Sequence, residues 1–232
     1  MGAFGTPTPV SMQRAAPATP SFASRAASSR GVSPRRATRT PALPSSAPRA
    51  EALAATRDAL LAAALGRGDE ALLPGGAGEA VEALLSELLL LSPPPTDATL
   101  LCGGWRLVMA SRGTVVTRAA SPLGFATVSD VRQALALRTD GALSTFNTAT
   151  LRTPVGDVKL CADGTWRPVS ASPCDGDVSF SSFGANALNV AVPSWFGPPR
   201  VARFRTLYLD DVLRVAEGAT SGNRFVFRRD AL

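Results

Sequence analysis

Residues 207–230, with the sequence LYLDDVLRVAEGATSGNRFVFRRD, predict two short antiparallel strands joined by a glycine turn. Gly218 and Gly222 bracket the turn, and glycine adopts backbone conformations that other residues resist. Because successive side chains of a strand alternate between its two faces, Phe225 and Phe227 share one face of the last strand. The segment therefore predicts a hairpin with one apolar face that closes an antiparallel sheet.

The rest of the chain after Trp105 has the same strand-and-turn character. The dipeptides Asp140-Gly141, Asp163-Gly164 and Asp175-Gly176 are hairpin signals. Regularly spaced antiparallel strands with one apolar face favour a closed barrel or a strongly curved sheet, because closure removes exposed edges. The expected strands cover residues 105–110, 114–118, 128–137, 143–148, 155–161, 177–183, 187–192, 202–209, 212–217 and 223–228. Prolines make residues 192–199 a loop, which carries Trp195 and Phe196.

Two helices are expected before the strands. Residues 51–65 hold a loose leucine stripe, and residues 79–91 hold a sharper one at helical spacing. Three prolines at residues 93–95 end the second helix. We expect the stripes to pack on the domain's own sheet, with contact to a lipid surface as the alternative. The fold class is thus α+β and mainly β, with a helical segment at 51–95 and an antiparallel barrel or strongly curved sheet at 96–232.

The first fifty residues differ from all that follows. They contain seven arginines and no Asp, Glu or Lys, and they are rich in Ser, Thr, Ala and Pro. This composition is typical of an organelle transit peptide, and a disordered basic tail that binds nucleic acid is the alternative. The whole chain carries +6, so residues 51–232 hold 17 basic residues (24 less 7) and 18 acidic ones. The positive charge thus belongs to the leader, and we expect no nucleic-acid partner for the domain.

Few residues suit catalysis or metal binding. The chain has no histidine, which removes Ser-His and Cys-His nucleophiles and histidine metal sites, and its one lysine, Lys159, has no acid at a pairing distance in sequence. Asp210 and Asp211 are adjacent, so they point to opposite faces and are expected to cap a turn or pair with an arginine such as Arg214. We expect no enzyme activity, cofactor or metal. The three cysteines are expected to be inert thiols: Cys102, Cys161 and Cys174.

The closing segment resembles that of the plastid lipid-associated proteins, also called plastid fibrillins. That family typically reads Tyr-Leu-Asp, an acidic pair, Leu-Arg-Ile, a glycine turn and an apolar strand. This chain departs from it at Val212 and Glu217, and its turn is about one residue longer. A helix, a proline-rich stop and then the strand opened by Gly103-Gly104-Trp105 are again similar. This Gly-x-Trp spacing is also found at the first strand of lipocalins, and the resemblance implies that the expected barrel or curved sheet is lipocalin-like. The closing-segment positions that match are Tyr208, Leu209, Asp210, Asp211, Leu213, Arg214, Val215, Gly218, Gly222, Asn223, Phe225 and Val226.

The resemblance implies a chloroplast protein of the stroma, or one held peripherally at plastoglobules or thylakoids, after loss of the transit peptide at 1–50. It supports two hypotheses. In one, an apolar barrel binds an isoprenoid, carotenoid, quinone or acyl lipid, with Arg214 orienting a head group. In the other, the chain coats lipid droplets or thylakoid margins through Trp195 and Phe196. An enzyme that uses only acids is a third hypothesis. The candidate ligand contacts are Trp105, Tyr208, Arg214, Phe225 and Phe227, although a packed core position is the alternative for each aromatic.

Overall fold

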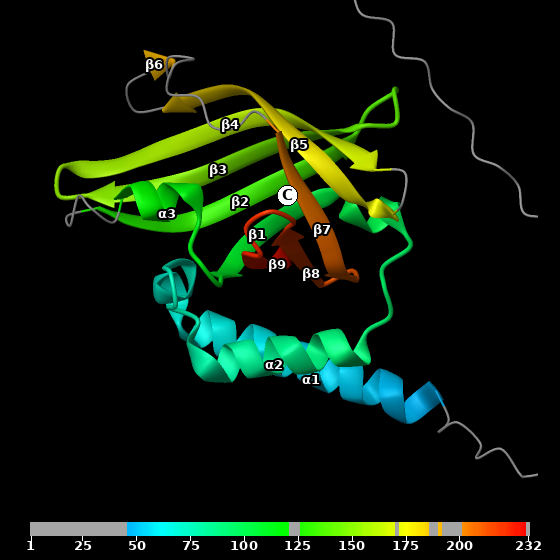
Figure 1. The fold of residues 1–232 in the computed structure, drawn as a ribbon. Helices are drawn as coiled ribbons and strands as arrows, with labels where there is room; N and C mark the ends of the chain where they lie inside the picture. The colour runs from blue at the N-terminus through cyan, green and yellow to red at the C-terminus, as the bar shows by residue number, and fades with distance from the viewer. Residues whose placement is uncertain (1–45, 121–125, 170–171, 186–189, 192–200, 231–232) are drawn as a thin grey trace, which may run out of the picture. The chain divides into compact units, whose positions relative to one another are not determined.

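The structure is a computed structural model that describes residues 46–120, 126–169, 172–185, 190–191 and 201–230 (Figure 1). Four helical segments precede the first strand, and one short helix follows it. In chain order the elements are α1 (Ser46–Gly66), η1 (Gly68–Leu72), α2 (Gly78–Leu91), η2 (Ala98–Leu101), β1 (Gly103–Ala110), α3 (Val115–Ala120), β2 (Thr127–Leu137), β3 (Leu143–Thr153), β4 (Gly156–Val169), β5 (Ser172–Ala185), β6 (Val190–Ala191), β7 (Val201–Leu209), β8 (Leu213–Gly218) and β9 (Arg224–Asp230).

Eight of these strands form a closed antiparallel barrel. Neighbours follow the order β1-β2-β3-β4-β5-β7-β8-β9, and β9 pairs back to β1. The short β6 pairs with the last residues of β5. Closure gives every strand of the barrel two neighbours, which removes the exposed edges that promote aggregation. The predicted mainly-β fold with a closed antiparallel barrel is confirmed.

Apolar side chains cover both faces of the wall made by β1, β8, β9 and the last residues of β7. Its outer face packs on α1 and α2, which lie side by side beneath β8 and β9 in Figure 1. Its inner face packs on residues from the far side of the barrel. Because side chains alternate along β9, Val226 contacts the helices while Phe227 faces inward. The predicted hairpin therefore has two apolar faces rather than one. The outer core includes Leu60, Leu85, Leu88, Met109, Tyr208, Leu213, Val215 and Val226.

The two leading helices follow the predicted leucine stripes, with different bounds at the start. In α2, Val81, Leu85 and Leu88 are buried against the barrel wall, as expected for a helix that packs on its own sheet. In α1 the start lies at Ser46, five residues before the predicted one and inside the predicted leader. Leu65, assigned to the first stripe, is 44% exposed. Among the described helices, none is long and apolar enough to cross a membrane.

The predicted strand at 114–118 is wrong, because this segment is the short helix α3. Its β-branched residues favour a strand, but Thr114 and Thr117 instead cap the first helical turn reciprocally. Thr117 N donates to Thr114 Oγ1 at 3.0 Å, and Thr114 N donates to Thr117 Oγ1 at 2.6 Å.

Two of the three predicted Asp-Gly turns are also wrong. Only Asp140-Gly141 joins two strands, β2 and β3, with Gly141 at φ 78°. Asp163-Gly164 lies inside β4, where the pairing with β5 shifts by one residue in a β-bulge. Asp175-Gly176 lies inside β5, where the missing side chain of Gly176 makes room for the ring of Trp166.

Candidate functional site

Aromatic side chains fill one end of the barrel. We call it the closed end: β1 begins there and η2 lies across it. Trp105 and Trp166 are fully buried, and Trp105 Nε1 donates to the carbonyl of Leu101 in η2 at 2.9 Å. This hydrogen bond gives the indole N–H its acceptor and fixes η2 over the barrel end. The other inward residues of this cluster include Leu107, Leu135, Leu143, Val178 and Phe227.

Arg214 lies in this aromatic cluster with 1% of its surface exposed. Its guanidinium carbon lies 4.7 Å from the ring centre of Phe227, 5.3 Å from that of Trp166 and 5.9 Å from that of Trp105. Such ring faces attract a cation, and the attraction grows when water is excluded. Burial, and then the nearby charge of Arg229, lower the pKa of Arg214 to about 9. Burial thus disfavours the charged form, but with a pKa of about 9 the guanidinium stays protonated at neutral pH.

The hydrogen bonds of Arg214 are incomplete. Nη1 donates to Gln133 Oε1 at 2.8 Å, whereas Nε is buried without a partner among the described residues. Within that same set, no carboxylate forms an ion pair with Arg214. Of the two acids predicted as possible partners, Asp210 pairs with Arg57, and Asp211 forms no ion pair with Arg214. A buried polar atom without a partner costs free energy, so it marks a place where a ligand can add a contact.

A layer of polar side chains lies next to Arg214 across the barrel interior. Gln133 Nε2 donates to Asn147 Oδ1 at 2.9 Å and approaches Thr145 Oγ1 at 3.4 Å. These bonds orient the amide of Gln133 with its oxygen toward Arg214. Gln133 and Asn147 are half-buried although they point inward. We refer to Arg214, Gln133, Asn147 and Thr145 as the polar floor.

Beyond the polar floor, toward the β3–β4 turn, the inward residues are apolar and only half-buried. We call this the open end. Pairing places Leu151 beside Val158, Asn147 beside Ala162 and Ala162 beside Phe183. Their outward neighbours Arg152, Lys159 and Asp163 are exposed, as strand alternation requires. The half-buried apolar residues that face inward here are Val131, Leu151, Val158, Leu160, Ala162, Phe180 and Phe183.

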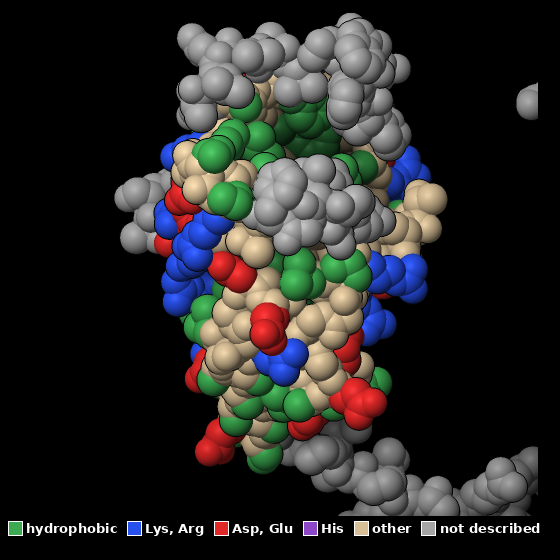
Figure 2. Space-filling model, turned by 90° about the vertical axis from the view of Figure 1, so that its left-hand side faces the viewer, with side chains coloured by type: hydrophobic (Ala, Val, Ile, Leu, Met, Phe, Trp, Pro, Cys, Tyr) green, Lys and Arg blue, Asp and Glu red, His purple; other side chains and the backbone are tan. Residues whose placement is uncertain are grey.

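Figure 2 looks onto the open end and shows a hollow walled by hydrophobic side chains. Side chains that face the barrel interior and yet keep exposed surface border space that no described side chain fills. Val128 and Ala149 are buried at this end, and half-buried Val116 of α3 packs against them. The described residues therefore divide the barrel interior into a packed aromatic half and an apolar half that their side chains leave unfilled.

Two cavities lie outside the barrel. One has about 130 Å³ and is bordered by α1, η1 and the outer side of β1 and β2. The other has about 240 Å³ and lies between the end of α2, Pro94, Pro95 and Leu207 of β7. Both are smaller than the roughly 300 Å³ or more that is usual for small-molecule sites.

Tyr208, a predicted ligand contact, lies on the outer face of the wall under the helices and does not line the barrel interior. Its hydroxyl donates to Asp210 Oδ2 at 2.6 Å, and Arg57 of α1 donates to the same oxygen at 3.1 Å. Asp210 Oδ1 accepts from the backbone N–H groups of Val212 and Leu213. Burial by itself raises the pKa of Asp210, but the hydrogen bonds together outweigh it and lower that pKa. Asp210 thus caps a turn, as predicted, and joins α1 to the barrel.

Two other residues of the family motif have structural roles at the closed end. Gly103 has φ 128°, and a Cβ there would collide with the guanidinium of Arg229. Arg229 lies over the indole of Trp105 at 4.0 Å and donates to the carbonyls of Leu100 and Cys102. Asp211 is exposed and contributes its backbone carbonyl to Arg229. These contacts hold η2 across the closed end.

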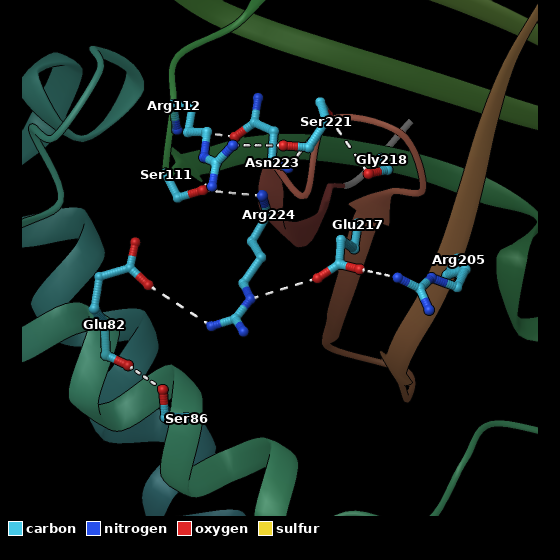
Figure 3. A network of polar contacts seen from close by, with 10 residues as sticks. All are labelled: Glu82, Ser86, Ser111, Arg112, Arg205, Glu217, Gly218, Ser221, Asn223 and Arg224. Carbon is cyan, nitrogen blue, oxygen red and sulfur yellow. Dashed lines mark hydrogen bonds and ion pairs between the residues drawn. The ribbon is translucent and has the colours of Figure 1, made fainter.

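The glycine turn of the family motif organises a polar network (Figure 3). Gly218 N donates to the carbonyl of Asn223, and Gly222 takes φ 60°. Asn223 is 3% exposed, accepts from Arg112 N at 2.8 Å and donates to the carbonyl of Gly113 at 2.6 Å. It therefore ties the last hairpin to the loop that follows β1. Arg224 adds ion pairs to Glu217 and to Glu82 of α2.

The structure brings together four of the five predicted ligand contacts. Trp105, Arg214 and Phe227 are in mutual contact, and half-buried Phe225 packs on the same inner cluster. Leu209 packs there too, while Leu213 faces the helices. Trp195 and Phe196 lie outside the described residues.

Sequence reasoning missed Trp166, Gln133 and Asn147. The predicted strand 155–161 stopped before Trp166 because Asp163-Gly164 was interpreted as a turn. A period of two, with Leu160, Ala162 and Trp166 on one face and Lys159, Asp163 and Thr165 on the other, runs through that dipeptide, and it was the available signal.

The described residues show neither a metal-binding cluster nor an activated thiol at Cys174. No cluster of three or more acidic or cysteine side chains with metal-binding geometry is found among the described residues. Cys174 is buried, and burial raises the pKa of its thiol, which makes it a poor nucleophile.

The chain matches no model in a scan of protein families, and a search of curated proteins finds no match either. The resemblance to the plastid fibrillins therefore rests on the residues quoted above and stays a prediction.

Proposed function

We propose that the open half of the barrel binds one hydrophobic small molecule, and that the chain is a non-enzymatic, lipid-associated protein of the plastid. The ligand class is an isoprenoid, carotenoid, quinone or acyl lipid. The observation that carries the proposal is the set of inward apolar side chains that remain half-buried at the open end. Ligand pockets are mostly apolar with a few placed polar groups, which is the composition of the open half above its polar floor.

The resemblance of the closing segment to the plastid fibrillins, and the Gly-x-Trp at β1 shared with lipocalins, support the same function. So does the Arg- and Ser-rich leader, which favours import into a plastid. The alternative function, a coat on lipid droplets or thylakoid margins, predicts a filled barrel, and the hollow at the open end argues against a filled one.

The test incubates the full chain with a total plastid lipid extract, repurifies it by size exclusion and identifies the retained lipids by mass spectrometry. We expect one lipid class at about one molecule per protein. Ala162→Trp fills the lumen from β4 and should abolish retention. Lys159→Trp adds the same side chain to the outer face of the same strand and should leave retention unchanged.

If no lipid is retained and yet the protein floats with lipid droplets, the barrel is not a binding site and the coat function holds. If both tryptophan variants retain as much lipid as the original chain, the lipid is bound on the surface.

A further inference from the structure

We propose that the ligand is a single-chain amphiphile whose anionic head group binds at the polar floor beside Arg214, with its tail along the open half of the barrel. This inference rests on the proposed function and narrows its ligand class. It selects acyl chains with a charged head group over carotenoids and other neutral hydrophobic molecules, because neutral molecules need no cation at the bottom of the hollow.

The first observation is an uncompensated charge. Arg214 is 1% exposed, and the described residues offer its guanidinium one hydrogen bond, to the neutral amide of Gln133. A second cation, Arg229, lies over the other part of the same indole and bonds to backbone carbonyls. Buried charges in proteins are normally paired, because leaving water costs several kcal/mol. Two arginines around Trp105 without a carboxylate among the described residues leave this region positive.

The second observation is the unused hydrogen-bonding capacity of the guanidinium. Arg214 Nε is buried and has no partner in the described part of the chain. A guanidinium presents its donors in a planar fork that matches the two oxygens of a carboxylate or phosphate. A neutral hydroxyl or ketone oxygen would satisfy one donor and leave the charge unbalanced. The geometry therefore favours an anion over a neutral acceptor.

The third observation is the position of the floor between the two halves of the barrel. Gln133 contacts Arg214 on one side and is half-buried on the side of the hollow. Rotation of this amide lets an incoming anion replace its oxygen as the acceptor for Nη1. Asn147, also half-buried, lies beside it and can donate to the same anion through its amide nitrogen.

The apolar path follows four residues of β4, about 13 Å at about 3.3 Å per residue, so it takes the part of an acyl chain next to the head group. Apolar inward side chains line β3, β4 and β5 from Ala162, next to Asn147, to Leu151 and Val158 at the β3–β4 turn. A head group at the floor thus places the far end of the tail at the open end. The orientation is fixed because the closed end is filled by aromatic rings.

The test measures the binding of three probes with the same eighteen-carbon chain: oleate, oleyl phosphate and oleyl alcohol. Titration calorimetry is performed on the full chain and on two variants. We expect oleate or oleyl phosphate to bind more tightly than the alcohol, and the stronger of the two identifies the head group. Arg214→Met should lower the affinity for the anionic probe by about tenfold to a hundredfold, which is the range for a lost charged hydrogen bond. It should leave the affinity for the alcohol within about threefold of the original value.

Gln133→Glu is the second variant and does not depend on how Arg214→Met folds. It puts a carboxylate in place of the amide that already contacts Arg214, so it supplies the missing counter-charge from the chain itself. We expect it to unfold at the same or a higher temperature than the original chain. It should lower the affinity for the anionic probe at least as much as Arg214→Met does, and it should leave the affinity for the alcohol unchanged.

Each outcome decides between the two proposals. If the chain binds the alcohol and both anions with equal affinity, and Ala162→Trp abolishes this binding, the anionic head group is refuted and the hydrophobic site is supported. Unchanged anion binding in Gln133→Glu and Arg214→Met refutes it as well. If none of the three probes binds, this inference fails, and retention of a lipid from the total plastid extract still decides the proposed function.

Discussion

Replacing Asp210 with Asn should loosen the attachment of α1 to the barrel by a measurable amount. Asp210 Oδ1 accepts from Val212 N at 2.8 Å and Leu213 N at 2.6 Å, and an amide oxygen can keep both bonds. The other oxygen accepts from Tyr208 and from Arg57, and an amide nitrogen in its place cannot.

The size of the effect follows from those two lost contacts. A hydrogen bond to a charged group contributes about 1.5–3 kcal/mol when buried. The bond from Tyr208 is of this kind, while Arg57 is 21% exposed and keeps a second partner in Asp58, so its loss adds little. We expect Asp210→Asn to lower the free energy of unfolding by about 2–3 kcal/mol. For a domain of this size that is about 5–10 °C in the unfolding temperature.

The assay is urea unfolding followed by tryptophan fluorescence, with Asp211→Asn as the matched control. Asp211 is the adjacent residue and is exposed, so the same substitution there should change stability by less than about 0.5 kcal/mol. Equal destabilisation by the two variants would refute the structural role of Asp210.

The same cluster predicts a pH dependence with a definite sign. The pKa of Asp210 is lower in the folded protein, so its contribution to stability is present above the unfolded value of about 3.9 and is lost as pH falls below it. The stability difference between the original chain and Asp210→Asn should therefore shrink below about pH 4.

Tyr208 supplies an optical check at alkaline pH, because it is the only tyrosine of the chain. Burial, and then the bond to Asp210, raise its pKa in the folded protein. That contribution to stability is complete below the unfolded value of about 10 and is lost as pH rises above it. Tyrosinate absorbance in the folded protein should appear only above that value and should move to lower pH in Asp210→Asn. Ordinary titration near pH 10 in the folded original chain would contradict the cluster.

Three further substitutions or reactions test the packing. Gly176→Ala places a methyl group against the ring of Trp166 and should destabilise the fold by about 1–3 kcal/mol in urea unfolding, whereas unchanged stability would mean that this contact is loose. Leu85→Ala should cost about 2–5 kcal/mol because the side chain is fully buried under the barrel, while Leu90→Ala, 83% exposed on the same helix, should cost less than about 0.5 kcal/mol. Cys174 should react with a thiol reagent only after unfolding, and labelling of the native protein at this position would show that the closed end opens.

Local patterns in the sequence were enough to predict the elements that repeat a clear period. The helix at Gly78–Leu91 was predicted within one residue, since its leucines follow the helical spacing and prolines end it. The hairpin of β8 and β9 was predicted because strand alternation and a glycine turn are both local signals. The barrel followed from the number and spacing of such strands.

Signals that depend on neighbours far along the chain were misinterpreted. Asp163-Gly164 has the local pattern of a turn, but β3 on one side and β5 on the other keep it extended, opposite a bulge in β5. Asp175-Gly176 is extended as well, because β5 pairs there with both β4 and β7. Interstrand hydrogen bonds outweigh the turn preference of two residues.

The candidate site shows most clearly the difference between what local sequence patterns predict and what long-range contacts decide. Alternation in the sequence determined that Phe225 and Phe227 share a face, and the closing motif singled out Arg214 as a residue of interest. Only the tertiary structure decided that Tyr208 lies under the helices while Arg214 faces the interior. A local period specifies which residues share a face of a strand, but it does not specify what lies opposite. Gln133 meets Arg214 across 81 residues of chain, and that contact exists because the register of eight strands closes the barrel.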